Sequence, residues 1–407
     1  MKQNIQKNIF YLLLMQGGNY LVPIILIPVI ISRLSLEVYG IIALAQGIMV
    51  LFTSLADFGF NMTGTRLISQ ATDNRSTLIN QIISIKTLNL IIGLICLLVI
   101  THLIPTWKAH TFLIVTSYAI TIGHGYFPVW YFQGIQKMGF ILVLNSLSRI
   151  LYLILVIFFV TNPSDAWLVN VFNGFTLLLA SFVAIQLIRQ KEGKINLDFS
   201  AETWYQYRLN WKIFGSNLAG DVYRSSAMII AGFVFTPVVL GTYGVFDKLI
   251  TLIQNGFAAI YRALFPAISN AVQYDHESIK PTYRSYLRKF GILTVAGSIS
   301  FVLLGDSVLA LISDEFEGNH TIELIFISFV PIIYFLSVPI SVNLVAFDKK
   351  NQYMKYNGTI ALVFILISPF LAYQLSIVGL LLSHTIALSL ALMLGFYYNK
   401  KQELILF

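Results

Sequence analysis

The run Ile91-Ile-Gly-Leu-Ile-Cys-Leu-Leu-Val-Ile100 carries no charged residue, and neither does the run Leu151-Tyr-Leu-Ile-Leu-Val-Ile-Phe-Phe-Val160. Each lies inside a longer apolar segment, 82–103 and 140–160. A helix needs about 20 mainly apolar residues to cross the hydrocarbon core of a bilayer. A membrane β-barrel would instead show short segments that alternate in polarity. These continuous runs therefore predict membrane-spanning helices and an all-α fold.

The composition of the whole chain is typical of an integral membrane protein. Of 407 residues, 57% are hydrophobic and 11% are charged, and the mean hydropathy is +0.78. A soluble domain carries roughly 25% charged residues because its surface faces water. The net charge of +8 is spread between the apolar runs, which indicates membrane topology and no nucleic-acid partner. The single cysteine, Cys96, excludes a disulfide framework and a cysteine-based metal site.

The hydropathy pattern predicts twelve spans, of which the last two are separated by almost no sequence. The spans lie at about 9–31, 40–59, 82–103, 110–132, 140–160, 166–188, 213–234, 240–262, 290–312, 321–345, 356–374 and 376–398.

Lysine and arginine alternate between the loops that join these spans. Cytoplasmic loops are enriched in both residues. The even-numbered loops hold most of the cations, among them Lys194, Lys289 and Lys350, whereas the odd-numbered loops hold only Arg33 and Lys108. The two terminal segments also carry lysines. This asymmetry predicts that both termini are cytoplasmic.

The longest polar stretch, 189–212, falls in the middle of the chain with six predicted spans on each side. Tyr39-Gly40 and Tyr243-Gly244 open equivalent spans, which agrees with an internal duplication. Repeats with an even number of spans are parallel, and such architectures place a substrate cavity between the halves. The expected organisation is an N-terminal six-helix bundle at 1–190, a cytoplasmic linker at 191–212 and a C-terminal six-helix bundle at 213–407.

No loop is long enough to fold into a further domain. The chain shows neither a Walker-type phosphate loop nor a histidine–carboxylate metal motif. The sequence therefore predicts no cofactor, no metal site and no direct use of ATP. An enzyme would have to work with residues inside the membrane, and we expect a protein that is not an enzyme.

Charged side chains inside the predicted spans are the main functional signal. Each costs roughly 2.5–3.5 kcal/mol at the centre of a helix that faces lipid, so it must face a partner or water. One interpretation is a set of ion pairs that hold helices in register. The other is a hydrated cavity for an anionic ligand, with carboxylates that couple transport to an ion. In that second interpretation Arg149, Arg224, Lys248 and Arg262 bind the substrate, and Asp221 and Asp247 serve the coupling ion.

Helical spacing indicates which of these charges can meet. Asp221 and Arg224 are three residues apart and can form a local ion pair. Asp247 and Lys248 are adjacent, so their side chains point about 100° apart on a helix. A third polar face lies in the span 140–160 and consists of Asn145, Ser148, Arg149 and Tyr152.

Two weaker signals have competing interpretations. His124 and His384 lie inside spans, where a histidine can carry protons near neutral pH or simply form a hydrogen bond in the packing. Trp130, Tyr131 and Phe132 end a span beside a lysine, which predicts an interfacial aromatic belt. Stacking of these rings against a sugar is the alternative.

Several short motifs are distributed along the chain. They are Ser32-Arg33-Leu34 with Glu37-Val-Tyr39-Gly40, Asp57-Phe-Gly59-Phe, Pro128-Val-Trp130-Tyr-Phe-Gln133-Gly134, Gly241-Thr-Tyr243-Gly244 and Leu264-Phe-Pro266-Ala-Ile-Ser269. In these motifs, and over nearly its whole length, the chain resembles the Wzx-type O-antigen flippases of the multidrug/oligosaccharidyl-lipid/polysaccharide superfamily. At Leu34-Ser35 it departs from them, because a glycine is expected after the leucine.

The resemblance implies a carrier that moves undecaprenyl-pyrophosphate-linked oligosaccharide across the bacterial inner membrane. It implies membrane lipids and a coupling ion, proton or sodium, as further partners, and an O-antigen polymerase and a chain-length regulator as associated proteins. An arginine offers paired donors to a pyrophosphate and a lysine offers a point charge, so a cationic cavity suits this substrate.

Two other functions stay open at this point. A cation-coupled drug exporter of the same superfamily would favour an acidic cavity, whereas cations outnumber carboxylates in the middle spans. An O-antigen polymerase, which is an enzyme, would show a large outward loop, and the outward loops here are short.

Overall fold

The computed structural model of the protein describes residues 18, 22–71, 74–274, 279–313, 315–316 and 320–401. Within these residues the chain forms helices and no strand, which confirms the all-α fold class. The N-terminal lysines and the start of the first predicted span lie outside the described residues.

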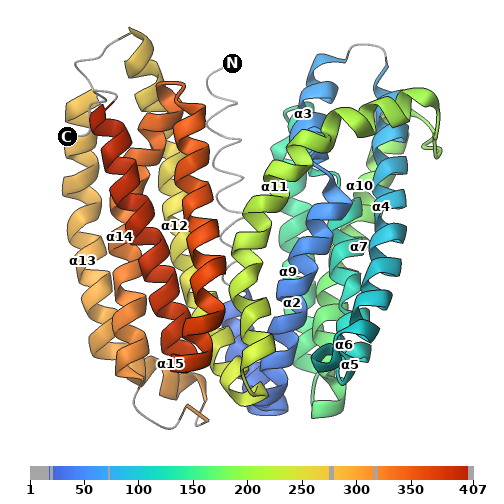
Figure 1. The fold of residues 1–407 in the computed structure, drawn as a ribbon. Helices are drawn as coiled ribbons and strands as arrows, with labels where there is room; N and C mark the ends of the chain where they lie inside the picture. The colour runs from blue at the N-terminus through green and yellow to red at the C-terminus, as the bar shows by residue number, and fades with distance from the viewer. Residues whose placement is uncertain are drawn as a thin grey trace. The chain divides into compact units, whose positions relative to one another are not determined.

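The chain divides into two compact units, Met1–Ser225 and Ser226–Phe407, and each is a bundle of helices (Figure 1). The first unit contains a helix at Val22–Leu34, α2 (Leu36–Asp57), α3 (Phe60–Gln70), α4 (Arg75–Leu103), α5 (Pro105–Lys108), α6 (Thr111–Thr116), α7 (Tyr118–Tyr126), α8 (Val129–Gly134), α9 (Met138–Phe159), a short 3-10 turn (Pro163–Asp165), α10 (Ala166–Glu192) and most of α11 (Ala201–Val234). The second contains α12 (Pro237–Tyr274), α13 (Ile279–Ile312), α14 (Thr321–Ala346) and α15 (Lys350–Lys401).

Eight helices in the described part of the chain are long and apolar enough to cross a membrane, so the protein is a multi-pass membrane protein. Three structural facts separate these eight helices from the twelve predicted spans. The helix Val22–Leu34, where the structure describes the end of the first predicted span, is too short to be counted. The last two predicted spans merge into α15, whose backbone breaks at Ser376 with φ 54°. α11 and α12, which carry the charges of two other predicted spans, are not among the eight.

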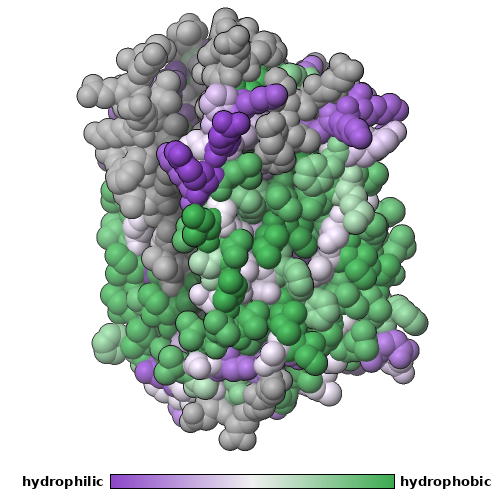
Figure 2. Space-filling model, turned by 90° about the vertical axis from the view of Figure 1, so that its left-hand side faces the viewer, coloured by the Kyte–Doolittle hydropathy of each residue, from purple (hydrophilic) through white to green (hydrophobic). Residues whose placement is uncertain are grey.

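The outer surface of the helices is apolar, as lipid contact requires. Figure 2 shows hydrophobic residues covering the middle of the face it presents, with hydrophilic residues towards the two ends. On α13, for example, the apolar side chains of Ile292, Leu303 and Leu311 are exposed. In water such a surface would be an interaction site, whereas in a bilayer it is the ordinary lipid-facing side.

The first unit is held together by a close crossing of α7 and α10. Gly174 of α10 lies against the backbone of Ala119, and the carbonyl oxygen of Gly174 approaches Gly123. A Cβ at either position would meet backbone atoms. Small residues at helix crossings let backbones approach in this way in membrane proteins.

Arg33, one of the two outward cations in the predicted topology, binds the end of a helix. Its Nη1 donates to the carbonyl oxygens of Ile157 at 2.5 Å and Val160 at 2.9 Å, at the C-terminus of α9. The last carbonyl groups of a helix have no partner within it and carry partial negative charge. This structural role explains why an arginine lies in a loop that the predicted topology places outside the cytoplasm.

Proline in α14 is compensated by a tyrosine from α13. Pro339 has no N–H, so the carbonyl oxygen of Phe335 lacks its helical donor. The hydroxyl of Tyr286 donates to that oxygen at 2.7 Å. Tyr283 likewise donates to Asn343. These hydrogen bonds join α13 to α14 and satisfy polar groups that the apolar surroundings would leave unpaired.

Candidate functional site

Arg149 lies in the interior of the first unit. It projects from α9 towards α10, where its Nη1 donates to Oδ1 of Asn173 at 2.7 Å. Ser148, on the same face of α9, donates to Thr176 at 3.3 Å. The four residues of the predicted polar face in span five, Asn145, Ser148, Arg149 and Tyr152, are all buried. The helical spacing therefore identified a face that turns inwards rather than to lipid.

Asp221 and Arg224 form a local ion pair on α11, as their spacing predicts. The pair joins Nη2 of Arg224 to Oδ1 of Asp221. Arg224 remains exposed in spite of this contact, whereas Asp221 is partly covered. Of the two paired side chains, Arg224 is therefore the one that is open to its surroundings.

The remaining predicted site residues, Asp247, Lys248 and Arg262, belong to α12 in the second unit. Asp247 and Lys248 are partly buried, and Arg262 is exposed. Arg149, Asp221 and Arg224 belong to the first unit, so the two sets are positioned by different bundles.

The sequence analysis did not single out the buried charged residue Lys86 of α4. Its Nζ is 2.9 Å from Oδ1 of Asp57, the last residue of α2, and only 2% of its side chain is exposed. The other oxygen of Asp57 accepts the backbone N–H of Asn61 in the first turn of α3 at 3.3 Å. The signal was present in the sequence, because Lys86 lies inside the predicted span 82–103.

The two histidines have different surroundings. His384 on α15 is buried, with its Nε2 3.4 Å from Nε2 of Gln254 and its ring edge-on to Phe364. His124 on α7 is exposed. In the described part of the chain no group of three or more His, Cys, Asp or Glu side chains is placed to hold a metal ion.

The prediction of an interfacial aromatic belt at Trp130, Tyr131 and Phe132 is wrong. All three rings are buried in the core of the first unit. Tyr131 donates its hydroxyl to Glu192 at the end of α10, at 2.7 Å. Burial also removes these rings as a surface on which a sugar could stack. The physical reason is that α8, which carries them, packs against α3 and α9.

The segment that follows α10 is fastened to α4. The backbone N–H of Asn196 donates to Asn80 at 3.0 Å, and that of Asp198 donates to Ser84 at 2.6 Å. The backbone N–H of Ser200 donates to the Asp198 carboxylate and holds its pKa below the usual range. This polar segment is thus a docked connection.

The first turns of α11 lie across one end of the first unit, and the helix then runs along it (Figure 1). They are anchored at the break between α2 and α3, where Phe58 and Gly59 have positive φ. The ring of Phe58 stacks on Tyr207 at 4.2 Å and on Phe214 at 4.5 Å. Stacked rings of this kind fix the orientation of the helix on the bundle.

Comparison with solved structures identifies the fold. The lipid II flippase MurJ in an inward closed conformation matches with a TM-score of 0.74 at 14% identity, covering 95% of this chain and 87% of that one. The MATE multidrug transporter DinF-BH matches with a TM-score of 0.65 at 14% identity, covering 98% and 96%. At such low identity these matches show a shared fold.

Sequence relatives agree with the resemblance found in the motifs. A protein of Escherichia coli (strain K12) named "Putative O-antigen transporter" is 26% identical over 412 residues, 98% of each chain. A protein of Shigella dysenteriae with the same name is 27% identical over 301 residues, 72% of this chain and 75% of its own. The model of the family described as "Polysaccharide biosynthesis protein" matches residues 5–272. The chain therefore belongs to this polysaccharide biosynthesis protein family, and it shares its fold with MurJ and the MATE transporter.

Proposed function

We propose that this protein is a flippase that moves an undecaprenyl-pyrophosphate-linked oligosaccharide, an O-antigen repeat unit, from the cytoplasmic to the periplasmic leaflet of the bacterial inner membrane. The observation that carries the proposal is the similarity, over 98% of both chains, to the protein named "Putative O-antigen transporter". The flippase function named for a protein of the same fold supports it.

The proposed organisation has twelve spans with both termini in the cytoplasm. Two six-helix halves, 1–190 and 213–407, are joined by the linker 191–212. Alternating access through a hydrated path would spare the sugar hydroxyls from hydrocarbon, where they would lack hydrogen-bond partners. The lipid tail can stay in the membrane throughout.

Four cations are proposed to bind the anionic headgroup: Arg149, Arg224, Lys248 and Arg262. Arg224 and Arg262 are exposed, and Lys248 is partly so, which gives a phosphate access to them. Arg149 is covered and held by the neutral amide of Asn173. An arginine side chain forms charge-assisted hydrogen bonds with phosphate oxygens.

We expect Arg149→Ala to lower the flipping rate tenfold or more, because a charge-assisted contact is worth about 1.5–3 kcal/mol. Arg149→Lys should keep part of the activity, since it keeps the charge. The measurement is transfer of a fluorescent polyprenyl-pyrophosphoryl oligosaccharide across proteoliposomes, normalised to the amount of folded protein.

Arg189→Ala is the matched control, because Arg189 is an exposed cation in the last turn of α10, the helix that also carries Asn173. It should flip at the wild-type rate. Normal flipping per folded molecule in all the variants Arg149→Ala, Arg224→Ala and Lys248→Ala would contradict the cationic site. Transport of a cationic drug in place of the glycan lipid would favour the drug-exporter alternative.

Ion coupling is proposed to use Asp247 rather than Asp221, because Asp221 is already paired with Arg224. Imposing a proton or a sodium gradient on the proteoliposomes should accelerate flipping. Asp247→Asn should abolish that acceleration and leave the slow gradient-free rate unchanged, whereas Asp221→Asn should retain it. A flipping rate that is indifferent to both gradients in the wild-type protein would refute the coupling.

A further inference from the structure

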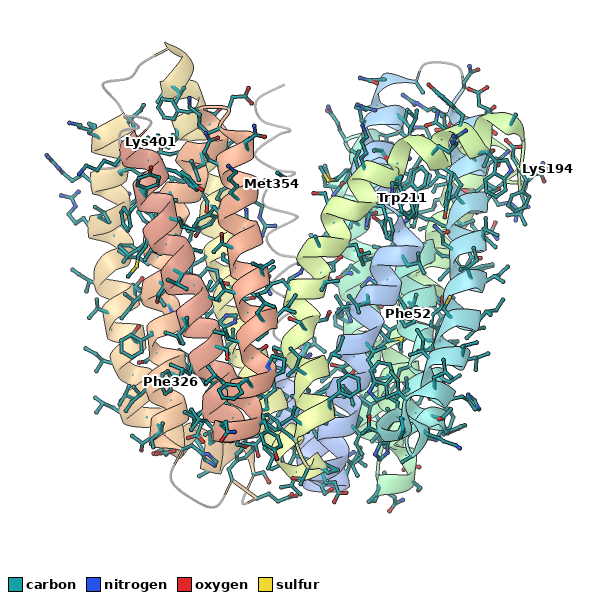
Figure 3. All side chains as sticks on the ribbon, viewed as in Figure 1. Phe52, Lys194, Trp211, Phe326, Met354 and Lys401 are labelled. Carbon is teal, nitrogen blue, oxygen red and sulfur yellow. The ribbon has the colours of Figure 1, made fainter. Side chains whose placement is uncertain are left out.

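Two tryptophans on α11 are exposed, whereas the others are covered. The protein has five tryptophans, all in the described part of the chain. Trp107 and Trp130 are buried and Trp167 is partly so, but Trp204 is 46% and Trp211 61% exposed. Seven residues separate the two exposed rings, which places them on the same face of the helix. Figure 3 labels Trp211 on this helix.

Cations are interleaved with these rings. Arg208 lies four residues after Trp204 and three before Trp211, so it shares their face. Lys212 follows one turn later, and both cations are exposed. Glu202 is the single acidic residue between Ala201 and Lys212. The exposed surface formed by Trp204, Arg208, Trp211 and Lys212, here called the α11 platform, therefore combines aromatic faces with positive charge.

The platform is rigid, because the opposite face of α11 is fixed to the bundle. Trp204 stands edge-on to Tyr207 with 5.9 Å between the ring centroids, and Trp211 is tilted against Phe214 at 5.6 Å. Tyr207 and Phe214 are in turn stacked on Phe58. Each indole thus has one side held by an anchored ring. A binding surface that is already ordered loses little conformational entropy when a ligand docks.

The chemistry of this surface fits a phosphorylated sugar. The C–H groups on one face of a sugar ring are weakly positive and pack against the negative face of an indole. Arginine and lysine bind phosphate oxygens with charge-assisted hydrogen bonds. A helix that only rested on the membrane would separate an apolar side from a cationic side. On the platform the rings and the cations alternate instead, and a phospholipid headgroup offers no sugar face to the indoles.

We infer that the α11 platform is a docking site for the phosphorylated glycan headgroup of the substrate, the indoles stacking on sugar rings and Arg208 and Lys212 binding the pyrophosphate. This inference rests on the proposed function and extends it to a surface outside the four proposed cations. By the proposed topology the platform lies on the cytoplasmic side, where the substrate begins. It contacts the headgroup before translocation.

The test measures binding to the full-length protein in nanodiscs of phosphatidylcholine. The probes are a polyprenyl pyrophosphate that carries one N-acetylhexosamine and the same lipid without the sugar. Trp204→Leu and Trp211→Leu should each weaken binding of the sugar-bearing lipid about threefold to tenfold and leave binding of the sugar-free lipid unchanged. Arg208→Gln should weaken binding of both lipids by roughly tenfold.

Leucine is chosen because it keeps a large apolar side chain at each position and removes the aromatic face. Phe112→Leu is the matched control, since Phe112 on α6 is 65% exposed at the other end of the first unit (Figure 1). It should bind both probes like the wild-type protein. Each variant is used only if its melting temperature matches that of the wild-type protein.

Equal binding of the sugar-bearing lipid by the wild-type protein and both Trp→Leu variants would overturn the inference. So would full displacement of this probe by phosphatidylglycerol at equal concentration, because the platform would then be a site for anionic phospholipid. Binding through the platform without transfer across proteoliposomes would refute the proposed function and leave the platform standing. If the protein transfers the lipid but its Trp→Leu variants bind the sugar-bearing lipid normally, the platform is refuted and the proposed function stands.

Discussion

We expect Gly174→Ala to prevent stable folding of the first unit. A Cβ on Gly174 would overlap the carbonyl carbon and oxygen of Ala119 and the nitrogen of Ile120, which are backbone atoms of α7. No side-chain rotation can relieve such an overlap, so the two helices must separate. Overpacking in a core costs typically about 1–3 kcal/mol, and a clash of backbone atoms belongs at or above the upper end of that range. The variant should be nearly absent from gel-filtration profiles of detergent-solubilised membranes.

Gly297→Ala is the matched control for this experiment. Gly297 lies inside α13, and a Cβ there would meet no heavy atom within 4 Å. Alanine in a helix interior is favoured over glycine by about 0.5–1 kcal/mol, so this variant should melt at or slightly above the wild-type temperature. If both variants melted alike, α7 and α10 would not cross as closely as the structure indicates.

The positions of the helices could be predicted because the hydropathy of each segment decides by itself whether that segment can span the membrane. The limits of α9 and α14, 138–159 and 321–346, agree within two residues with the predicted spans 140–160 and 321–345. Lipid imposes the same requirement on every span, namely about 20 apolar residues with internally satisfied backbone groups. No knowledge of the neighbouring helices is needed.

Packing partners could not be predicted in the same way, because they depend on residues distant in the chain. Trp130 beside a lysine is typical of an interface, yet α3, far earlier in the sequence, covers it. Arg33 departs from the charge asymmetry, and its partner, the end of α9, lies more than 120 residues later in the chain. The inward face around Arg149 was predicted, since helical spacing alone decides which residues share a face.

One departure from the family pattern gains a physical meaning. Ser35 occupies the position after Leu34 where a glycine is expected, and its backbone has φ 89° and ψ 159°. That region is essentially reserved for glycine, because a Cβ there clashes with the backbone. The serine side chain accepts a hydrogen bond from the N–H of Val38 at 3.4 Å, so the residue caps α2 in a strained conformation.

The second large effect is expected at the ion pair between Lys86 and Asp57. The side chains are 2% and 17% exposed, and they join α4 to the end of α2. Removing one partner of a buried pair leaves an uncompensated charge and costs about 3–5 kcal/mol. We expect this loss for Lys86→Met and for Asp57→Asn, measured as the free energy of unfolding in mixed micelles. Asparagine keeps an acceptor for the N–H of Asn61, so the Asp57→Asn loss reports the charge.

The double variant Asp57→Asn/Lys86→Met should recover most of the stability, because replacing both partners of a buried pair with neutral groups is often close to neutral. The pair Lys191–Glu192, 3.9 Å apart with the lysine exposed, is the matched control, and Lys191→Met should cost about 0–1 kcal/mol. Additive losses in the double variant would show that the two charges do not interact. A recovery would mean that Lys86 and Asp57 fix α4 against the α2–α3 break, the same break on which Phe58 anchors α11 and its platform.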